Sequence, residues 1–276
     1  MTYPLQMTAP ALPLSAPDAS FWHRLWRREP RLVAFAAVML ALMIPAAIGL
    51  LVDERTLRDV NVWVKPMKFM LSVALTALTT AWFAPLLPEA VRRGRAFGLL
   101  VWTIIATGGF EVAYIAVQAA LGQASHYNVG DPFHAAMYTL MGIGAVVLTA
   151  TQPWLAWMIW RHGRPGVAPA YRLGVLLGLV LTFVLGAGAG ILLGGGTPAP
   201  SPGLPVLGWS MVAGDFRVAH FVGIHAGQVL PLLGFAVAAA GLRRASALVW
   251  LGSALWCALF AAVLGQALAG RPLIGI

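Results

Sequence analysis

The sequence predicts an all-α protein, a polytopic bundle of about seven transmembrane helices with the N-terminus inside and the C-terminus outside. Three observations predict this fold class. Hydrophobic residues make up 60% of the 276 residues and charged residues only 10%, whereas about a quarter of a soluble domain is charged. The apolar residues fall into seven long runs, and basic residues gather at alternate loops. A soluble core of this size cannot bury so much apolar surface, so the main solvent must be a lipid bilayer.

Residues 1–30 differ from the rest. They begin with a stretch rich in Pro, Ala and Thr that lacks the features of a signal peptide, and we expect it to be disordered. Between Asp18 and Glu29, aromatic and basic side chains interleave, which predicts a short amphipathic helix at the membrane interface. A merely basic flank is the alternative. Residues 31–270 are expected to form a single transmembrane domain.

Each apolar run is long enough to cross a hydrocarbon core of about 30 Å. The runs cover residues 31–52, 62–86, 95–121, 132–160, 171–195, 217–240 and 246–268. With the N-terminus inside, twelve of the eighteen basic residues fall on the inner side. The charge of +9 therefore indicates orientation, with no nucleic-acid partner. We expect the bacterial inner membrane, with the outer loops in the periplasm. The single cysteine, Cys257, excludes an intrachain disulfide.

The fifth run has a small residue at every fourth position. The stripe consists of Gly174, Gly178, Thr182, Gly186, Gly190 and Gly194. Small residues let a second helix approach closely in lipid. The second helix could belong to the same chain or to another copy, so the stripe also raises the hypothesis of a homo-oligomer.

Polar residues inside a bilayer are costly, and here they follow helical spacing on three runs. The second run carries Asn61, Lys65, Lys68, Ser72, Thr76 and Thr79, the third Thr103, Thr107, Glu111, Tyr114 and Gln118, and the fourth, more weakly, His134, Tyr138, Thr149 and Gln152. These stripes predict a shared polar interior.

Glu111 lies deep in its run, far from any basic residue along the chain. The functional interpretation is a proton-carrying or cation-binding group, and the alternative is a structural carboxyl bonded to a neighbouring helix. Lys65 and Lys68, the only lysines, lie near the outer interface. They either extend toward water or face a ligand.

The start of the sixth run places Arg217, His220, His225 and Gln228 on one broad arc. Together with the outer-side residues His126 and His134, these histidines are candidate ligands for haem or a transition metal. Histidines five residues apart, however, diverge by about 140°. We expect an outward-facing polar pocket that is closed on the inner side by apolar residues. Its predicted lining is Lys65, Lys68, Glu111, Tyr114, Gln118, Tyr138, Arg217 and Gln228.

The segments Trp63–Phe69 (WVKPMKF) and His220–Gln228 (HFVGIHAGQ) resemble those of a family of bacterial polytopic inner-membrane proteins to which no activity is attached. The resemblance implies a multi-pass membrane protein and no function. Three hypotheses follow from the residues. The first is binding or transport of a small ligand, ion or proton, the second is a haem or metal redox protein, and the third is a scaffold. No enzymatic activity is assigned, because no Ser–His–acid set has a recognisable spacing.

Overall fold

A computed structural model of the chain describes residues 21–200, 202–205 and 207–275. The segment predicted to be disordered lies largely outside these residues. Short elements are α1 (Phe21–Arg28), β1 (Thr56–Leu57), β2 (Val60–Asn61) and α4 (Glu89–Arg92). Long helices are α2 (Pro30–Val52), α3 (Val64–Phe83), α5 (Arg95–Ala120), α6 (Pro132–His162), α9 (Phe216–Ala239) and α10 (Ala245–Leu268). A further span runs through α7 (Pro169–Leu181), a π-helical turn (Thr182–Ala187) and α8 (Gly188–Gly195).

The prediction of an all-α polytopic bundle is confirmed. In the described part of the chain, seven helical segments are long and apolar enough to cross a membrane. Their ends lie within two residues of the predicted runs. Large apolar side chains point outward along them, for example Leu51, Trp160 and Leu232, which are 84%, 65% and 66% exposed. Such a surface is stable only against lipid, and the protein is an integral, multi-pass membrane protein.

Residues at the helix ends explain where several helices begin. Proline occupies the first positions of α2, α6 and α7, where its missing N–H costs little. The Asp131 carboxylate accepts hydrogen bonds from the N–H groups of Phe133 and His134, and Asp215 accepts one from the N–H of Arg217. Both aspartates are N-caps that satisfy amides with no partner inside the helix.

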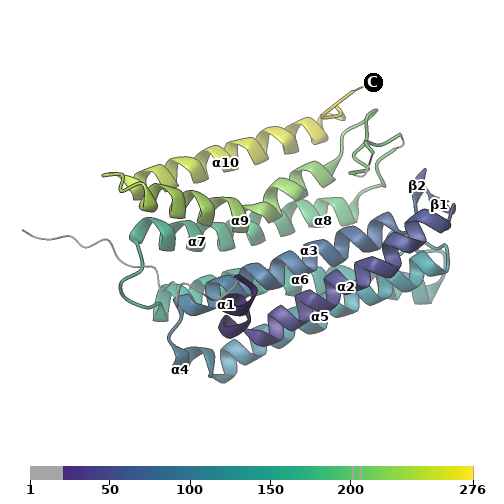
Figure 1. Cartoon of the computed structure of the whole chain (residues 1–276). Coiled ribbons are helices and arrows are strands. Elements are labelled where there is room, and N and C mark those ends of the chain that lie inside the picture. The colour runs from purple at the N-terminus through teal and green to yellow at the C-terminus, as the bar shows by residue number, and fades with distance from the viewer. Residues whose placement is uncertain (1–20, 201, 206, 276) are drawn as a thin grey trace, which may run out of the picture.

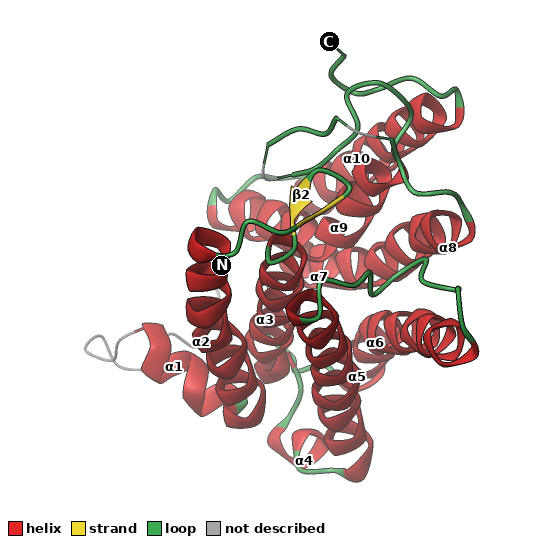
Figure 2. Ribbon diagram, turned by 90° about the vertical axis from the view of Figure 1, so that its right-hand side faces the viewer, coloured by secondary structure: helices red, strands yellow, loops and turns green. Residues whose placement is uncertain are grey.

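The helices run side by side, with α1 and α4 at one end of the bundle and the β1–β2 hairpin at the other (Figure 1). Viewed along the helices, α2, α3, α5 and α6 form one group, while α7–α8, α9 and α10 form a second (Figure 2). The groups join chiefly where α6 packs against α7. The loops predicted to lie inside are all at the α1–α4 end, and which end faces the cytoplasm stays a prediction.

The β1–β2 hairpin lies beside the end of α5. Strand residues pair antiparallel, and Arg58 and Asp59 at the turn have positive φ values of 52° and 60°. The Trp63 indole donates to Asp53 Oδ2 at 2.9 Å, and the Arg55 guanidinium donates to the Ala120 carbonyl at 3.1 Å. The second bond satisfies a carbonyl at the C-terminus of α5, so the hairpin is fixed to that helix.

The small-residue stripe packs against α9 of the same chain. A Cβ added to Gly178 would lie 2.8 Å from the Ala226 carbonyl oxygen, and one added to Gly186 would lie 2.8 Å from Ile224 Cγ2. Gly190 faces His220 of α9, whereas Gly194 faces the Tyr138 hydroxyl of α6. The partner helix is therefore within the chain, and these glycines do not offer a surface for the homo-oligomer that the sequence left open.

Replacing Gly223 of α9 by alanine should test this contact. The new Cβ would lie 2.6 Å from the Gly186 amide nitrogen, so the two backbones must separate. We expect Gly223→Ala to lower the free energy of unfolding by about 1–3 kcal/mol, measured by denaturation in detergent. Gly142→Ala is the matched control, since its Cβ would meet nothing within 4 Å. Equal stability of the two variants would contradict this packing.

Candidate functional site

One face of α5 carries three buried polar side chains, Glu111, Tyr114 and Gln118, which we call the α5 polar stripe. They are only 2%, 8% and 3% exposed. Glu111 Oε1, the Tyr114 hydroxyl and Gln118 Oε1 have no hydrogen-bond partner in the structure. Most buried polar atoms in proteins are paired, so three orphans along one helix face are unusual. They identify this face as the centre of the candidate site.

The stripe faces α3 and α6. Tyr114 packs in a small cluster with Phe69 of α3 and with Met137 and Met141 of α6. Beside Glu111, helix α6 has Gly144, where an added Cβ would lie only 3.1 Å from Glu111 Oε1. The absence of a side chain at this glycine therefore provides the space that the carboxyl group occupies.

Lys65, in the first turn of α3, is the cation that acts on the stripe. Its charge interacts with that of Glu111, although no ion pair within 4.0 Å forms between them. Lys65 Nζ also lies 5.9 Å from the centre of the Phe69 ring. The positive charge of Lys65 repels that of Arg58 and disfavours protonation of His126. A cation and a carboxyl group thus share one buried region without neutralising each other through direct contact.

His126 closes this region from the loop before α6. Its ring lies 6.0 Å from that of Phe69 and 5.7 Å from that of Tyr138, and its Nδ1 is 3.3 Å from Ser125 Oγ. Burial, and then the charge of Lys65, lowers the pKa of His126 to about 3, although a hydrogen bond from the ring to the Ser125 backbone acts in the opposite direction. The imidazole is therefore neutral near pH 7.

Two tyrosines, Tyr127 in this loop and Tyr138 in α6, attach this region to α8. The Tyr138 hydroxyl donates to the Gly194 carbonyl at 2.5 Å, and the Tyr127 hydroxyl donates to the Leu193 carbonyl. Arg58 lies over the Tyr127 ring at 5.3 Å. Burial, together with the nearby Tyr138, raises the pKa of Tyr127 to about 12. The Tyr127 hydroxyl therefore remains a protonated donor. Tyr138 contacts His126 through its ring, while its hydroxyl is bonded to α8.

Lys68 and Arg217 form a second group, the cation pair, beneath the loop before α9. Lys68 Nζ donates to the Leu207 carbonyl at 2.7 Å. Lys68 Nζ and Arg217 Nη1 each lie 3.7 Å from the place that a Cβ on Gly208 would take. Asp215 binds the other side of Arg217 at 2.6 Å. Burial raises the pKa of Asp215, but hydrogen bonds from Arg217 and from the Ser210 amide outweigh it, so the net shift is downward.

The histidines of α9 diverge. His220 Nδ1 lies 2.8 Å from the carbonyl oxygen of Gly186, in the π-helical turn. His225 Nδ1 lies 3.1 Å from Gln228 Oε1, and Gln228 Nε2 donates to Thr79 of α3 at 3.2 Å. His220 is thus directed at the π-helical turn and Gln228 at α3, whereas His225 contacts Gln228 and Phe221 of its own helix.

His134 has separate partners again, Asp131 at 2.5 Å and Gln123 at 3.1 Å. Within residues 21–275, as far as the structure describes them, no three His, Cys, Asp or Glu side chains are grouped to hold a metal. Each of His126, His134, His220 and His225 contacts a different element. No observation therefore favours the hypothesis that these histidines form one haem or metal centre.

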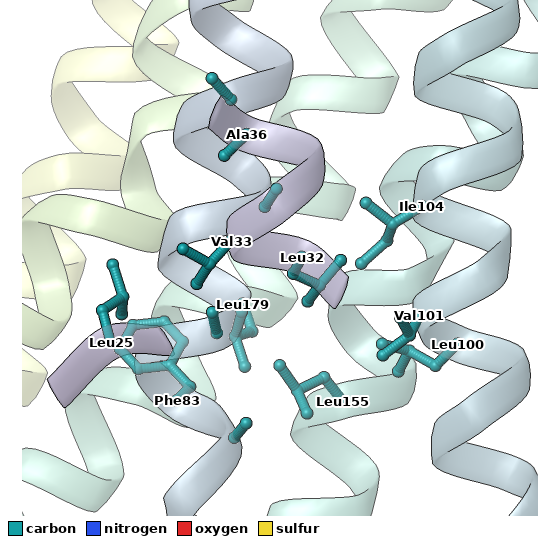
Figure 3. Close-up of a cluster of buried hydrophobic side chains, with 14 of the residues drawn as sticks. Leu25, Leu32, Val33, Ala36, Phe83, Leu100, Val101, Ile104, Leu155 and Leu179 are labelled. Atoms are coloured by element: carbon teal, nitrogen blue, oxygen red, sulfur yellow. The ribbon is translucent and has the colours of Figure 1, made fainter. Parts of the chain in front are cut away.

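Apolar side chains close the region below Glu111. Phe97, Leu100, Val101 and Ile104 of α5 are fully buried. Figure 3 shows several of them converging with Leu32 of α2 and with side chains of α6 and α7. The polar stripe therefore extends from Glu111 toward the β1–β2 end only.

The residues of the predicted lining fall into three groups. Lys65, Glu111, Tyr114, Gln118 and Tyr138 lie on α3, α5 and α6, with the metal candidate His126 beside Tyr138, Lys68 and Arg217 form the cation pair, and Gln228 lies between α3 and α9. Sequence reasoning missed Arg58, Tyr127 and Gly144. Tyr127 follows a candidate histidine directly, but loop residues give no periodic signal.

Comparison of the chain with protein-family models, with curated proteins and with solved structures finds no match. The resemblance of the segments Trp63–Phe69 and His220–Gln228 to a family therefore stays a prediction.

His126 should make the protein sensitive to acid. Its pKa of about 3 lies below the value of 6.5 expected in the unfolded chain, so between these values the unfolded state binds one more proton. Stability is then complete above pH 6.5 and falls as the pH drops toward 3, by up to about 1.4 kcal/mol per pH unit. In thermal denaturation, His126→Gln should flatten this slope between pH 6.5 and 4. An unchanged slope would show that His126 is protonated in the folded protein.

Proposed function

We propose that this membrane protein binds or transports a small ligand, ion or proton at a polar pocket that opens toward the β1–β2 end of the bundle. The observation that carries the proposal is the α5 polar stripe, with its three buried oxygens that lack protein partners. Leaving such groups unsatisfied in a bilayer costs free energy. A protein retains them where they bind water, a proton or a ligand during function.

The charges support two different roles. Among the residues that the structure describes, Glu111 is the only carboxyl group inside a membrane span, and we assign it the titrating role. Lys65 and the cation pair are concentrated at the open end, where they would attract and hold an anion. Lys68 and Arg217 converge on Gly208 without contacting Glu111, so anion and proton would occupy neighbouring positions.

We also propose that the protein resides in a bacterial inner membrane with the β1–β2 end in the periplasm. The uneven distribution of arginines supports this orientation, because positively charged loops stay on the cytoplasmic side. The apolar cluster below Glu111 would then separate the pocket from the cytoplasm until the helices rearrange.

The role of Glu111 can be tested by proton flux. Purified protein is reconstituted in liposomes that contain a pH-sensitive dye, and a pH gradient is imposed. Glu111→Gln keeps the size of the side chain but removes the titrating group, so we expect protein-dependent proton flux to fall by at least tenfold. Glu89→Gln is the matched control, because Glu89 is exposed and paired with Arg93 at the other end. Equal flux through Glu111→Gln and wild type would refute a proton-carrying role.

The cation pair can be tested with simple anions. We expect acetate or inorganic phosphate to raise the melting temperature of the detergent-solubilised protein, since a ligand of the folded state stabilises it. Lys68→Met should weaken binding of the anion by about tenfold, because it removes one hydrogen bond between charged groups. Arg271→Gln removes an exposed charge at the same end and should leave the titration unchanged. Identical titrations for all three proteins would reject an anion site at Lys68.

A further inference from the structure

An apolar groove lies at the opposite end of the bundle, along the seam between α2 and α3. Its volume is about 290 Å³ and its lining is Trp22, Val33, Ala36, Ala37, Leu40 and Leu78. These residues come from α1, α2 and α3, and none carries a charge. The groove is separate from the polar pocket, and nothing in the proposed function uses it.

The groove reaches about one leaflet deep. Its lining on α2 runs from Val33 to Leu40, and Leu40 lies about 14 Å along the helix from Arg31. Half of the hydrocarbon core of a bilayer is about 15 Å thick. The deepest part of the groove is therefore close to the middle of the membrane, which an acyl chain also reaches.

Helix α1, which contributes Trp22 to the groove, and the start of α2 are rich in basic residues. Residues 21–31 contain Arg24, Arg27, Arg28 and Arg31 against one carboxylate, Glu29, which binds Arg31 at 2.6 Å. Two tryptophans of the same helix, Trp22 and Trp26, are 56% and 50% exposed. Arginine and tryptophan side by side are typical of the level at which lipid head groups lie.

The position of α1 is fixed by the bundle. Leu25 is buried against the core, and the Arg28 guanidinium lies 3.8 Å from the centre of the Trp82 ring and donates to the Trp82 carbonyl at 3.3 Å. Arg92 donates to the Arg28 carbonyl at 3.0 Å. Helix α1, which carries Trp22 of the groove and three arginines, is therefore fixed against the bundle.

We propose that this groove binds an anionic phospholipid, with one acyl chain along Val33, Ala37 and Leu40 and the phosphate among the arginines of α1. Charge complementarity selects an anionic head group, and the depth of the groove selects an acyl chain over a folded partner. Occupancy of the site, which contacts α1, would then depend on the fraction of anionic lipid in the leaflet on that side.

Native mass spectrometry of the full chain in detergent tests the proposal, with phosphatidylglycerol as the anionic probe and phosphatidylcholine as the zwitterionic one. The wild-type protein should retain phosphatidylglycerol more tightly than phosphatidylcholine. Arg27→Gln should weaken phosphatidylglycerol binding roughly fivefold, as expected for one basic residue at an anionic surface, and leave phosphatidylcholine unchanged. Arg161→Gln removes another exposed arginine at the same end and should have no effect.

A second variant tests the groove itself. Ala37 is exposed within the groove, so Ala37→Trp should fill it and abolish preferential retention of phosphatidylglycerol. Ala106→Trp adds the same side chain to a lipid-facing position of α5 and should retain it. Equal retention of both lipids by wild type, or full retention by Ala37→Trp, overturns the proposal. Conversion of a dimer to a monomer by Ala37→Trp overturns it as well, since a second copy would then be the occupant.

Discussion

The structure depends on one constraint: in the hydrocarbon region no water is present to satisfy a polar group. Backbone amides and carbonyls are therefore paired within helices, and polar side chains must find partners inside the bundle. Thr107 and Thr149 obey this rule by donating to carbonyls one turn earlier, and Gln228 obeys it by reaching Thr79 on another helix. Against this background, the orphan oxygens of α5 stand out as groups whose partners the protein itself does not supply.

The two ends of the molecule differ in the balance of basic and acidic side chains. At the β1–β2 end, cations and carboxylates alternate, and several form pairs such as Arg55 with Asp53 and Arg217 with Asp215. At the α1–α4 end, arginines greatly outnumber carboxylates. A balanced end suits selective binding near a buried cation such as Lys65, whereas an unbalanced end suits attraction to a negatively charged membrane surface. The proposed polar pocket and the apolar groove lie at the ends that match these properties.

The spans and the α5 stripe could be predicted from the sequence, because hydropathy and helical spacing are local properties of the chain. The partners of each helix could not. The small-residue stripe predicted a close contact, but only the folded chain identifies α9 as the partner. In the same way, the arc of His220 and His225 suggested a shared site, while the structure directs one to Gly186 and the other to Gln228. Angular position on a helix is encoded locally, whereas the neighbour it meets depends on the whole fold.

The π-helical turn at Thr182–Ala187 has a geometric consequence for that contact. Four residues of α-helix advance about 400°, so a residue repeated at every fourth position drifts by about 40° per step. From Gly174 to Gly190 this drift would carry the glycines well away from α9. A π-helical turn, with bonds to the fifth residue, rotates less per residue and returns the later glycines toward the same neighbour. The wider turn thus compensates for the drift, and the glycines from Gly174 to Gly190 face α9 on both sides of it.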